Sequence, residues 1–433
     1  MKKRLNIGIL GLGTVGSGVL HILKEHQEKI SQVTGYTMGI KTALVRQIEK
    51  HQNQTDIHLT TDVETILKDP EIHIIVEVMG SIEPAKDYIL QALKQGKHVV
   101  TANKDLIALH GNELTQVAKE NHCDLYYEAS VAGGIPILRA LVDSLAADNI
   151  KKVMGIVNGT TNFMLTKMAK NGLSYEAVLA EAQALGFAEA DPTNDVDGID
   201  AARKMVILSR LAFGMNLPLS AISTGGIRSV TATDIQIAHQ LGYTIKLIGA
   251  AEEQNGTIHG MVGPMLLPNE HPLSGVNNEN NAVFVTGSSV GETMFYGPGA
   301  GELPTATSVV SDLITVAKNI RMHTTGDGFS HYQHETKLTA KEDIQAKYYL
   351  RLNMTDQTGT FLKLTQLFAA HQIGFEQIIQ QPFDQNSAMV IIITHQGSKE
   401  QLDQAIAGLE SDSDMVLKAR FDVLEESICT KDY

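Results

Sequence analysis

The residues best suited to chemistry lie in one acid-rich segment that runs from Gly186 to Lys204. Its five carboxylates fall within twelve residues and are Glu189, Asp191, Asp195, Asp197 and Asp200. Acids this close repel one another unless something cationic is shared. Asp200 and Lys204 are four residues apart and fall on one face of a helix. Such a lysine can be held by a carboxylate and still face a substrate pocket, where the other acids bind an ammonium group. A solvated acidic loop with one helical ion pair explains the pattern equally well.

A second candidate lysine, Lys104, closes the run Thr101-Ala102-Asn103-Lys104, just after a predicted strand over 97–101. Ligands of open parallel sheets collect at the carboxyl ends of the strands. Lys104 therefore lies where a substrate and a cofactor should meet. The alternative is a surface lysine at a helix start, but a cation is disfavoured at a helix N-terminus, which modestly favours a functional role.

A glycine-rich turn follows the first predicted strand and opens a helix. In a dinucleotide-binding turn, Gly11 allows the tight bend, Gly13 lets the backbone approach a pyrophosphate, and Gly16 allows close helix–strand packing. The phosphate charge then lies at the positive end of the helix dipole. This context favours a cofactor site over a glycine-rich turn without a ligand. The predicted cofactor-binding residues of the turn are Gly11, Gly13, Thr14, Val15 and Gly16.

The tip of the second predicted strand reads Ala43-Leu44-Val45-Arg46-Gln47. It lacks the acid that bonds the ribose hydroxyl in NAD-preferring sites. Arg46 could instead hold a 2′-phosphate, with Lys50 as a second cation, which favours NADP. A solvated surface arginine is the alternative, and the nearby Glu49 leaves NAD open.

The run Asn158-Gly159-Thr160-Thr161-Asn162 ends a predicted strand and begins a predicted helix. Gly159 and Thr160 could bind a substrate carboxylate through backbone donors and a hydroxyl. Capping of the helix explains the run equally well.

The two cysteines argue against covalent catalysis and exclude a disulfide scaffold or a cysteine-based zinc site. Formation of a thioester needs a cysteine nucleophile. Cys429 lies near the end of the chain, and Cys123 is expected to pack as a small hydrophobe. Direct hydride transfer between an alcohol and an aldehyde fits better. His331 and His334 lie in a polar segment and are interpreted as solvated.

The elements that must position these residues alternate between strand and helix over the first 130 residues. Apolar runs over 5–10, 38–45, 72–78 and 97–101 predict strands, and a helix is predicted over 84–95. This alternation predicts a doubly wound parallel sheet of the Rossmann type. The glycine-rich Gly297–Ala306 and the helical pattern after it are expected to complete this domain with residues 303–320.

The rest of the chain predicts two further domains. Residues 131–302 are read as an α+β catalytic and dimerisation domain, with helices that include 137–147. Residues 321–345 have no apolar period and are read as a linker. Residues 346–433 show the order β-α-β-β-α-β, which is the ferredoxin-like arrangement.

Composition bounds the possible partners. The 433 residues carry 35 basic and 49 acidic side chains, so the formal net charge is −14. Neither nucleic acid nor an anionic membrane is drawn to an acidic surface. We found no apolar stretch of about 18 residues or more, so we expect a cytoplasmic protein with a small-molecule substrate. We also expect a homodimer or homotetramer, because a ferredoxin-like sheet exposes an edge.

Taken together, these residues resemble homoserine dehydrogenases of the monofunctional bacterial type with a C-terminal ACT regulatory domain. The resemblance covers nearly the whole chain, and its segments are Gly11–Gly16, Thr101–Lys104, Glu128–Pro136, Glu189–Lys204 and Gly297–Ala306. The set from Asp191 to Lys204 is the most specific and makes the functional interpretation of the acid-rich segment the stronger one. We therefore expect the form of the enzyme without a fused aspartate kinase domain.

The resemblance implies reversible, NAD(P)H-dependent reduction of L-aspartate 4-semialdehyde to L-homoserine, in the route to threonine, methionine and isoleucine. By position, Lys204 matches a proposed proton donor and Lys104 a second lysine at the reacting carbonyl. Which of the two donates is not fixed by sequence. Glu189 matches a substrate-binding acid, and Asp195 and Asp200 match acids that orient the substrate and the lysine. Predicted cofactor contacts also include Ala102, Lys104 and Ser130.

The resemblance also implies a monovalent cation and an effector. The cation, expected to be sodium, matches the Glu128 side chain and the backbone carbonyls of Val131, Gly133 and Ile135. Phe187 stands where some relatives carry tyrosine. The family implies threonine as the usual effector at paired ACT domains. The loop Asp356-Gln357-Thr358-Gly359 lacks the proline found in many ACT domains, which leaves the effector open.

Three hypotheses follow from the sequence. The first is a homoserine dehydrogenase, which needs Lys104, Lys204, Glu189 and the glycine turn together. The second is another nicotinamide-dependent enzyme acting on a small charged aldehyde or amino acid. The third is a non-catalytic amino-acid sensor in which the ACT domain dominates. A substrate panel separates the first two, and replacing Lys204 separates an enzyme from a sensor.

Overall fold

The computed structural model describes residues 3–51, 57–329, 333–384 and 386–425. The chain forms two compact units that each combine several segments. The first unit comprises Met1–Val153, Arg203–Leu219 and Asn280–Glu335, and the second comprises Met154–Ala202, Ser220–Glu279 and Thr336–Tyr433. Strand β7 (Ile150–Ile156) and helix α10 (Ile199–Phe213) carry the chain from one unit into the other.

The first unit is built on a six-stranded sheet with the order β3-β2-β1-β4-β5-β6. Every neighbouring pair in it is parallel. The strands are β1 (Lys3–Leu10), β2 (Tyr36–Leu44), β3 (His58–Thr60), β4 (Ile72–Glu77), β5 (His98–Thr101) and β6 (Leu125–Tyr126). This order reverses between β1 and β4, where doubly wound sheets bind their ligands. The predicted parallel sheet is therefore confirmed.

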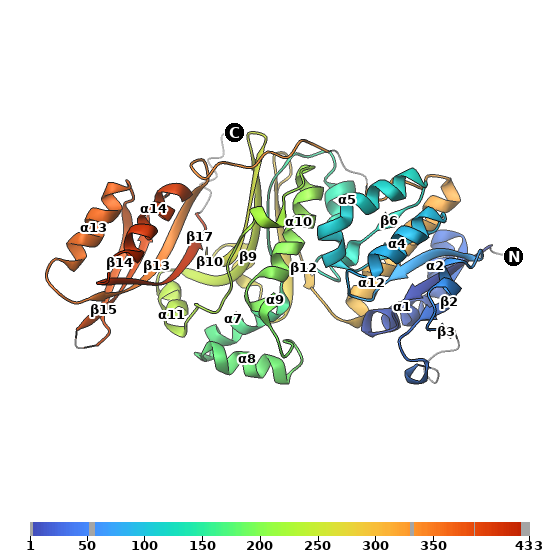
Figure 1. The fold of residues 1–433 in the computed structure, drawn as a ribbon, viewed down its shortest axis with the longest axis horizontal. Helices are drawn as coiled ribbons and strands as arrows, with labels where there is room; N and C mark the ends of the chain where they lie inside the picture. Colours follow the sequence, from blue (N-terminus) through green and yellow to red (C-terminus); the bar gives the residue numbers. More distant parts are fainter. Residues whose placement is uncertain (1–2, 52–56, 330–332, 385, 426–433) are drawn as a thin grey trace. The chain divides into compact units, whose positions relative to one another are not determined.

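Helices pack on this sheet (Figure 1). Their buried faces are apolar. They are α1 (Thr14–Glu25), α2 (Gln27–Thr34), α3 (Glu64–Leu67), α4 (Ala85–Lys94), α5 (Lys104–Glu120) and α12 (Glu302–Met322). In α4, for example, Ile89, Ala92 and Leu93 are buried at helical spacing. Gly18 of α1 lets α12 approach closely, because a Cβ there would lie 2.8 Å from the Glu302 carbonyl. An antiparallel pair, β11 (Asn280–Gly287) and β12 (Gly291–Pro298), precedes α12.

The predicted helix over 137–147 differs in form. The chain makes one short α-helical turn, α6 (Ile137–Arg139), followed by a π-helical turn over Ala140–Ser144. The Leu145 amide donates to the Ala140 carbonyl at 2.8 Å, which is the i→i+5 bond of a π-turn. Apolar spacing indicates a helical segment here but does not distinguish the two hydrogen-bond patterns.

The second unit holds a long antiparallel hairpin beside several helices. Strands β9 (Tyr243–Gln254) and β10 (Thr257–Pro268) meet at the turn Asn255-Gly256, where both residues have positive φ. Asn-Gly favours such a turn. No strand is predicted over 243–254 from the sequence alone. The remaining elements are α7 (Gly159–Asn171), α8 (Tyr175–Ala184), α9 (Thr193–Val196), β8 (Ser223–Thr224) and α11 (Ala232–Gln240).

The C-terminal part of the second unit has the predicted β-α-β-β-α-β order. Its elements are β13 (Gln345–Thr355), α13 (Thr360–Ala370), β14 (Phe375–Pro382), β15 (Ser387–Thr394), β16 (Gly397–Ser398), α14 (Lys399–Glu410) and β17 (Met415–Val423). The strands run in the order β17-β13-β15-β14, and these pairs are antiparallel. Leu350, Leu364 and Leu402 belong to the apolar core between sheet and helices. Strand β17 also pairs in parallel with β10, so this sheet continues into the hairpin.

Two residues of the predicted linker over 321–345 make contacts with the rest of the chain. Phe329 is buried against the rings of Tyr126 and Tyr127 in the first unit, with centroids about 5 Å apart. Leu338 bridges to Ile258 in the second unit. His334 is exposed, whereas His331 lies outside the described residues, as does Cys429.

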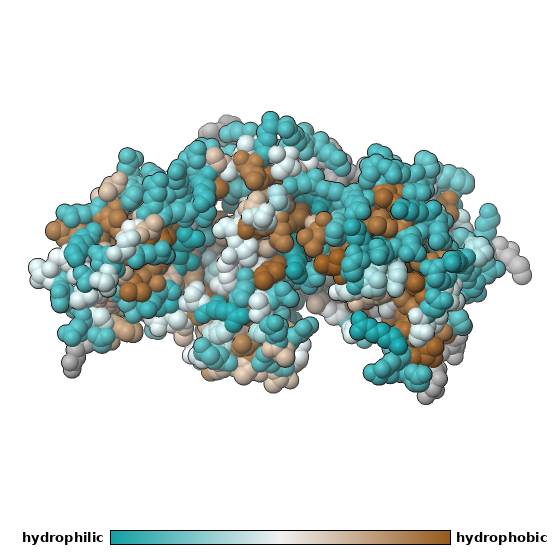
Figure 2. Space-filling model, viewed as in Figure 1, coloured by the Kyte–Doolittle hydropathy of each residue, from teal (hydrophilic) through white to brown (hydrophobic). Residues whose placement is uncertain are grey.

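The face drawn in Figure 2 is covered mainly by hydrophilic residues, with hydrophobic ones in small groups between them. In the described part of the chain, no helix combines the length and the apolar character that crossing a membrane requires.

Candidate active site

The glycine turn joins β1 to α1, and each of its three glycines meets a different structural requirement. Gly11 has φ of +102°, and its amide donates to the Leu44 carbonyl at 3.1 Å. A Cβ on Gly16 would overlap the Gly11 carbonyl, so only glycine lets the helix start this close to the strand. A Cβ on Gly13 would meet nothing within 4 Å, so the turn keeps open space beside its backbone. This open backbone lies at the N-terminus of a twelve-residue helix, which is where a pyrophosphate is expected to bind.

The other predicted cofactor residues belong to the same unit as this turn. Thr14 and Val15 are the first two residues of α1. The exposed Arg46 follows the tip of β2, two residues beyond the Leu44 carbonyl that binds Gly11. The Ala102 amide donates to the Glu77 carbonyl at 3.2 Å.

A buried carboxyl that the sequence analysis missed organises the turn after β5. Glu77 is fully buried at the end of β4. Its carboxylate accepts the Thr101 hydroxyl at 2.6 Å and the Met79 amide at 2.7 Å. Burial raises the pKa of Glu77. The Thr101 hydroxyl in turn accepts the amide of Asn103, whose side chain caps α5. This network fixes the turn that delivers Lys104 as the first residue of α5.

Both predicted lysines lie on helices of the first unit that are tied together. Asp105 follows Lys104 on α5, Arg203 precedes Lys204 on α10, and their side chains pair at 3.0 Å. Further along α10, the buried Arg210 donates to the Ile107 carbonyl of α5 at 3.2 Å. Lys104 is therefore the chain neighbour of Asp105, and Lys204 is the chain neighbour of Arg203, the two partners of this ion pair.

The acid-rich segment separates into residues with different tasks. Asp191 lies two residues before α9 and accepts the Thr193 amide at 3.1 Å, and bonds to Thr193 lower its pKa. Asp197 pairs with Arg228 at 2.6 Å. Asp195 and Asp200 converge on one side chain, Asn158, described below. The five carboxylates look equivalent in the sequence but differ in the structure. Asp191 and Asp197 hold the local fold, Asp195 and Asp200 converge, and Glu189 is exposed.

Asn158 joins the converging pair. Its amide nitrogen donates to Asp195 Oδ1 at 2.7 Å and to Asp200 Oδ2 at 2.9 Å. Its amide oxygen accepts the Thr161 amide and the Thr161 hydroxyl, both at 2.9 Å, and so caps α7. The sequence pattern indicated the cap as an alternative to ligand binding, but it gave no sign of the link to the two acids.

The residues predicted to bind the substrate carboxylate and ammonium lie at the start of α7 and in the loop before α9. Gly159 is the first residue of α7, and a Cβ there would lie 2.7 Å from the Glu279 carbonyl. The Thr160 hydroxyl donates to the Phe187 carbonyl at 2.7 Å. The Phe187 ring packs on Phe163, with centroids 4.7 Å apart. These contacts fix the loop that carries Glu189.

Glu128, the predicted side-chain ligand of a cation, is buried in the first unit. Its carboxylate oxygens accept the amides of Leu138 and Arg139 at 2.8 Å each. Its own amide donates to Asp312 at 2.9 Å, and Arg139 pairs with that aspartate. Burial raises the pKa of Glu128 to about 7 and that of Asp312 to about 8.

The predicted carbonyl ligands belong to the loop that follows Glu128. Ser130 is buried, and its hydroxyl donates to the Tyr127 carbonyl at 2.6 Å. Val131 and Ile135 are buried, and the Ile135 carbonyl accepts the Ile137 amide. Gly133 has φ of +45°, its carbonyl accepts the Ser308 hydroxyl, and a Cβ there would overlap the Gly299 carbonyl. A buried carboxylate followed by a loop of carbonyls suits a monovalent cation, since buried charges are paired or bind metals.

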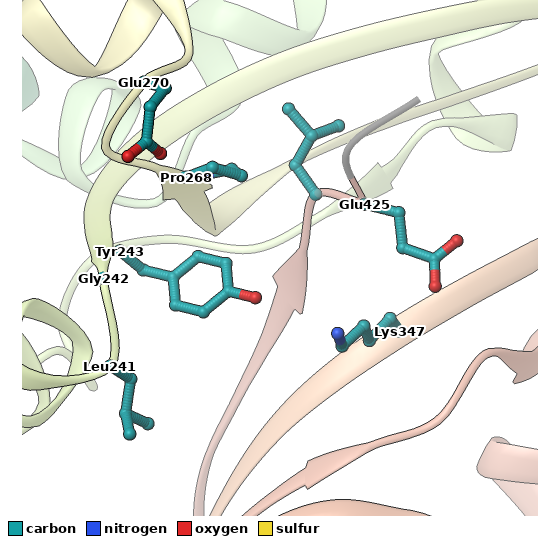
Figure 3. A pocket seen from close by; sticks show the side chains of 8 residues that line it. Leu241, Gly242, Tyr243, Pro268, Glu270, Lys347 and Glu425 are labelled. Atoms are coloured by element: carbon teal, nitrogen blue, oxygen red, sulfur yellow. The ribbon is translucent and has the colours of Figure 1, made fainter. Parts of the chain in front are cut away.

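A separate pocket of about 490 Å³ lies within the second unit, where β9 begins and β10 and β17 end (Figure 3). Tyr243 and Lys347 point their polar ends into it. The Lys347 ammonium pairs with Glu376 at 2.5 Å. None of the predicted site residues lines this pocket, whose lining residues are Leu241, Gly242, Tyr243, Pro268, Glu270, Lys347, Leu424 and Glu425.

Comparison with known proteins gives a consistent result. Residues 11–128 match the family model described as homoserine dehydrogenase, NAD binding domain, and residues 136–314 match the model described as homoserine dehydrogenase. A homoserine dehydrogenase from Bacillus subtilis is 51% identical over 412 residues, which cover 94% of this chain and 95% of that protein. The chain belongs to the homoserine dehydrogenase family. Homoserine dehydrogenases are NAD(P)-dependent oxidoreductases, so the expected enzyme class is confirmed.

Solved homoserine dehydrogenases share the fold. The enzyme from Thiobacillus denitrificans matches with a TM-score of 0.92 at 37% identity, covering 98% of this chain and 99% of that one. A hyperthermophilic archaeal homoserine dehydrogenase in complex with NADPH matches with a TM-score of 0.62 at 29% identity, covering 72% of this chain and 97% of that one. These matches and the NAD-binding model support a nicotinamide cofactor.

Proposed function

We propose that this homoserine dehydrogenase catalyses the reversible reduction of L-aspartate 4-semialdehyde to L-homoserine, in the aspartate-derived route to threonine, methionine and isoleucine. The observation that carries the proposal is the placement of Lys104 and Lys204 on two helices joined by the Asp105–Arg203 ion pair. Lys104 follows the carboxyl end of a strand in a doubly wound sheet, where a substrate is expected.

The residues divide the chemistry as follows. The nicotinamide, when bound, supplies or accepts the hydride. Lys204 donates a proton to the substrate oxygen as the alcohol forms and takes it back in the oxidation. Lys104 stabilises the negative charge that develops on that oxygen. Glu189, Asp195 and Asp200 orient the substrate ammonium and the lysine, and the start of α7 at Gly159 and Thr160 receives the substrate carboxylate.

We propose NADP as the preferred cofactor. Arg46 follows the tip of β2 beside the glycine turn, where a 2′-phosphate needs a cation.

The open space at Gly13 makes a direct test of dinucleotide binding at the glycine turn possible. We expect Gly13→Ala to leave the thermal unfolding temperature of the unliganded protein unchanged while weakening NADP binding at least tenfold, roughly 1.4 kcal/mol. Fluorescence titration gives the Kd, and an unchanged Kd contradicts the proposed site. Gly16→Ala, whose Cβ would overlap the Gly11 carbonyl, provides the contrasting variant and should lower the unfolding temperature itself.

The cation and the regulation are also proposals. Sodium would be held by Glu128 and the carbonyls of Val131, Gly133 and Ile135, where it would offset the buried carboxylate charge. The β-α-β-β-α-β part of the second unit supports an ACT module that binds an amino-acid effector, with threonine expected, and homo-oligomers joined through its sheet edge.

The proposed function is tested by homoserine oxidation followed at 340 nm, with NADP and NAD in parallel. We expect activity with both and a preference for NADP. Replacing sodium chloride with choline chloride at equal ionic strength should lower the rate. A panel of other small hydroxy and amino acids separates this substrate from its analogues. Activity on the panel without activity on homoserine would contradict the proposal.

A further inference from the structure

A single buried amide lies between the two acids that the proposed function assigns to the substrate and the lysine. Asn158 is 5% exposed and uses both of its side-chain polar atoms. Its nitrogen reaches Asp195 and Asp200, while its oxygen caps α7 through Thr161. All four groups lie in the second unit.

Two carboxylates that bind one NH2 group are drawn together against their own repulsion. Like charges a few ångströms apart disfavour the doubly ionised state. The two N–H bonds are charge-assisted and among the stronger hydrogen bonds in proteins. An asparagine suits this position because it supplies two donors without adding a charge of its own.

We propose that Asn158 is a positioning residue that fixes the spacing and direction of the Asp195–Asp200 pair, so that the pair is preformed for an ammonium group. This inference rests on the proposed function for the identity of the substrate. The clamp made by the amide nitrogen is distinct from the cap made by the amide oxygen, and the two can be separated by substitution.

Two substitutions separate them. Asn158→Ser keeps a side-chain oxygen, which serves well at an N-cap, but it loses both N–H donors of the amide, and its one O–H sits on a shorter side chain that cannot bind both carboxylates at once. Asn158→Asp also keeps a capping oxygen, and its charge is favourable at a helix N-terminus. It places a third carboxylate against Asp195 and Asp200, so both variants keep a cap and lose the clamp, and Asn158→Asp adds repulsion.

Asn158→Asp is expected to cap α7 more strongly than Asn158→Ser but to be the less active of the two variants. We expect Asn158→Ser to lower kcat for homoserine oxidation about 100-fold, as misplacement by about 1 Å does in other sites. Asn158→Asp should lose about tenfold more. KM for NADP should stay within twofold of wild type in both. Ser174→Ala, which removes the cap that Ser174 provides to Ala177 at the start of α8, is the matched control. It should lower the unfolding temperature slightly and leave kcat unchanged.

The outcomes are distinct. A wild-type kcat in Asn158→Ser overturns the inference, and so does activity that simply follows the unfolding temperature across the three variants. Wild-type protein inactive on homoserine contradicts the proposed function instead. In that case a crystal structure of Asn158→Ser decides, because the Asp195 carboxylate should leave its position beside Asp200. Unchanged positions of both carboxylates would overturn the clamp regardless of activity.

Discussion

Replacement of Lys204 by alanine is expected to lower kcat for homoserine oxidation by about 1,000-fold, within the range that general acid–base catalysis contributes. The variant loses the group proposed to take the hydroxyl proton. It retains the glycine turn, so the Kd for NADP, measured by fluorescence titration, should stay within about twofold of wild type. Stopped-flow absorbance at 340 nm gives the rate.

Two further variants make the Lys204 result specific. Lys204→Arg keeps the positive charge, but its side chain does not deprotonate in proteins, so it should remain nearly inactive. Lys94→Ala, at the exposed end of α4, should behave as wild type. A Lys204→Ala variant that keeps more than a tenth of the wild-type kcat would remove Lys204 from the proton-transfer role and point to Lys104. A response to amino acids that persists without any turnover in wild type would favour the sensor hypothesis.

The largest expected effect on stability comes from Asp234→Ala. Asp234 is fully buried at the start of α11. One of its oxygens accepts Tyr349 and Arg351 of β13 at 2.7 Å each. The other accepts the amide and the hydroxyl of Thr231 in a capping box. Removing it leaves the Arg351 guanidinium, 14% exposed, without this carboxylate. Breaking a buried pair from one side costs about 3–5 kcal/mol, so urea unfolding should show a markedly lower midpoint.

Two further variants divide the lost free energy of unfolding among the contacts of Asp234. Tyr349→Phe removes one hydrogen bond to Asp234 and should cost about 1 kcal/mol. The double variant Asp234→Ala, Arg351→Met removes the charge left behind and should recover part of the loss, because a buried pair replaced by apolar groups is often tolerated. A loss below about 1 kcal/mol for Asp234→Ala would show that the network does not hold β13 to α11.

Local patterns in the sequence determined much of this fold. The Gly11–Gly16 turn, the apolar strands before and after it, and the C-terminal β-α-β-β-α-β order all follow from residues close to one another in the chain. Hydrophobic periodicity and turn chemistry act over a few residues, so they can be read directly. The same holds for the spacing of Asp200 and Lys204, which four residues of helix place on one face. The long strand β9 was missed because its buried run of Ile245 to Ala251 lacks an alternating pattern.

Tertiary structure alone decided which acids belong together. Asp191, Asp195 and Asp197 are equivalent in the sequence, yet one accepts the amide of Thr193 nearby, one bonds to Asn158 and one pairs with Arg228. Arg228 lies 31 residues from Asp197, and Asn158 lies 37 residues from Asp195. Contacts at longer range, such as the Glu128 amide with Asp312 at a separation of 184 residues, depend on how whole elements pack. A hydrogen bond between distant residues leaves no local periodicity, so residue type and spacing select the candidates, and only the folded chain assigns each of them a partner.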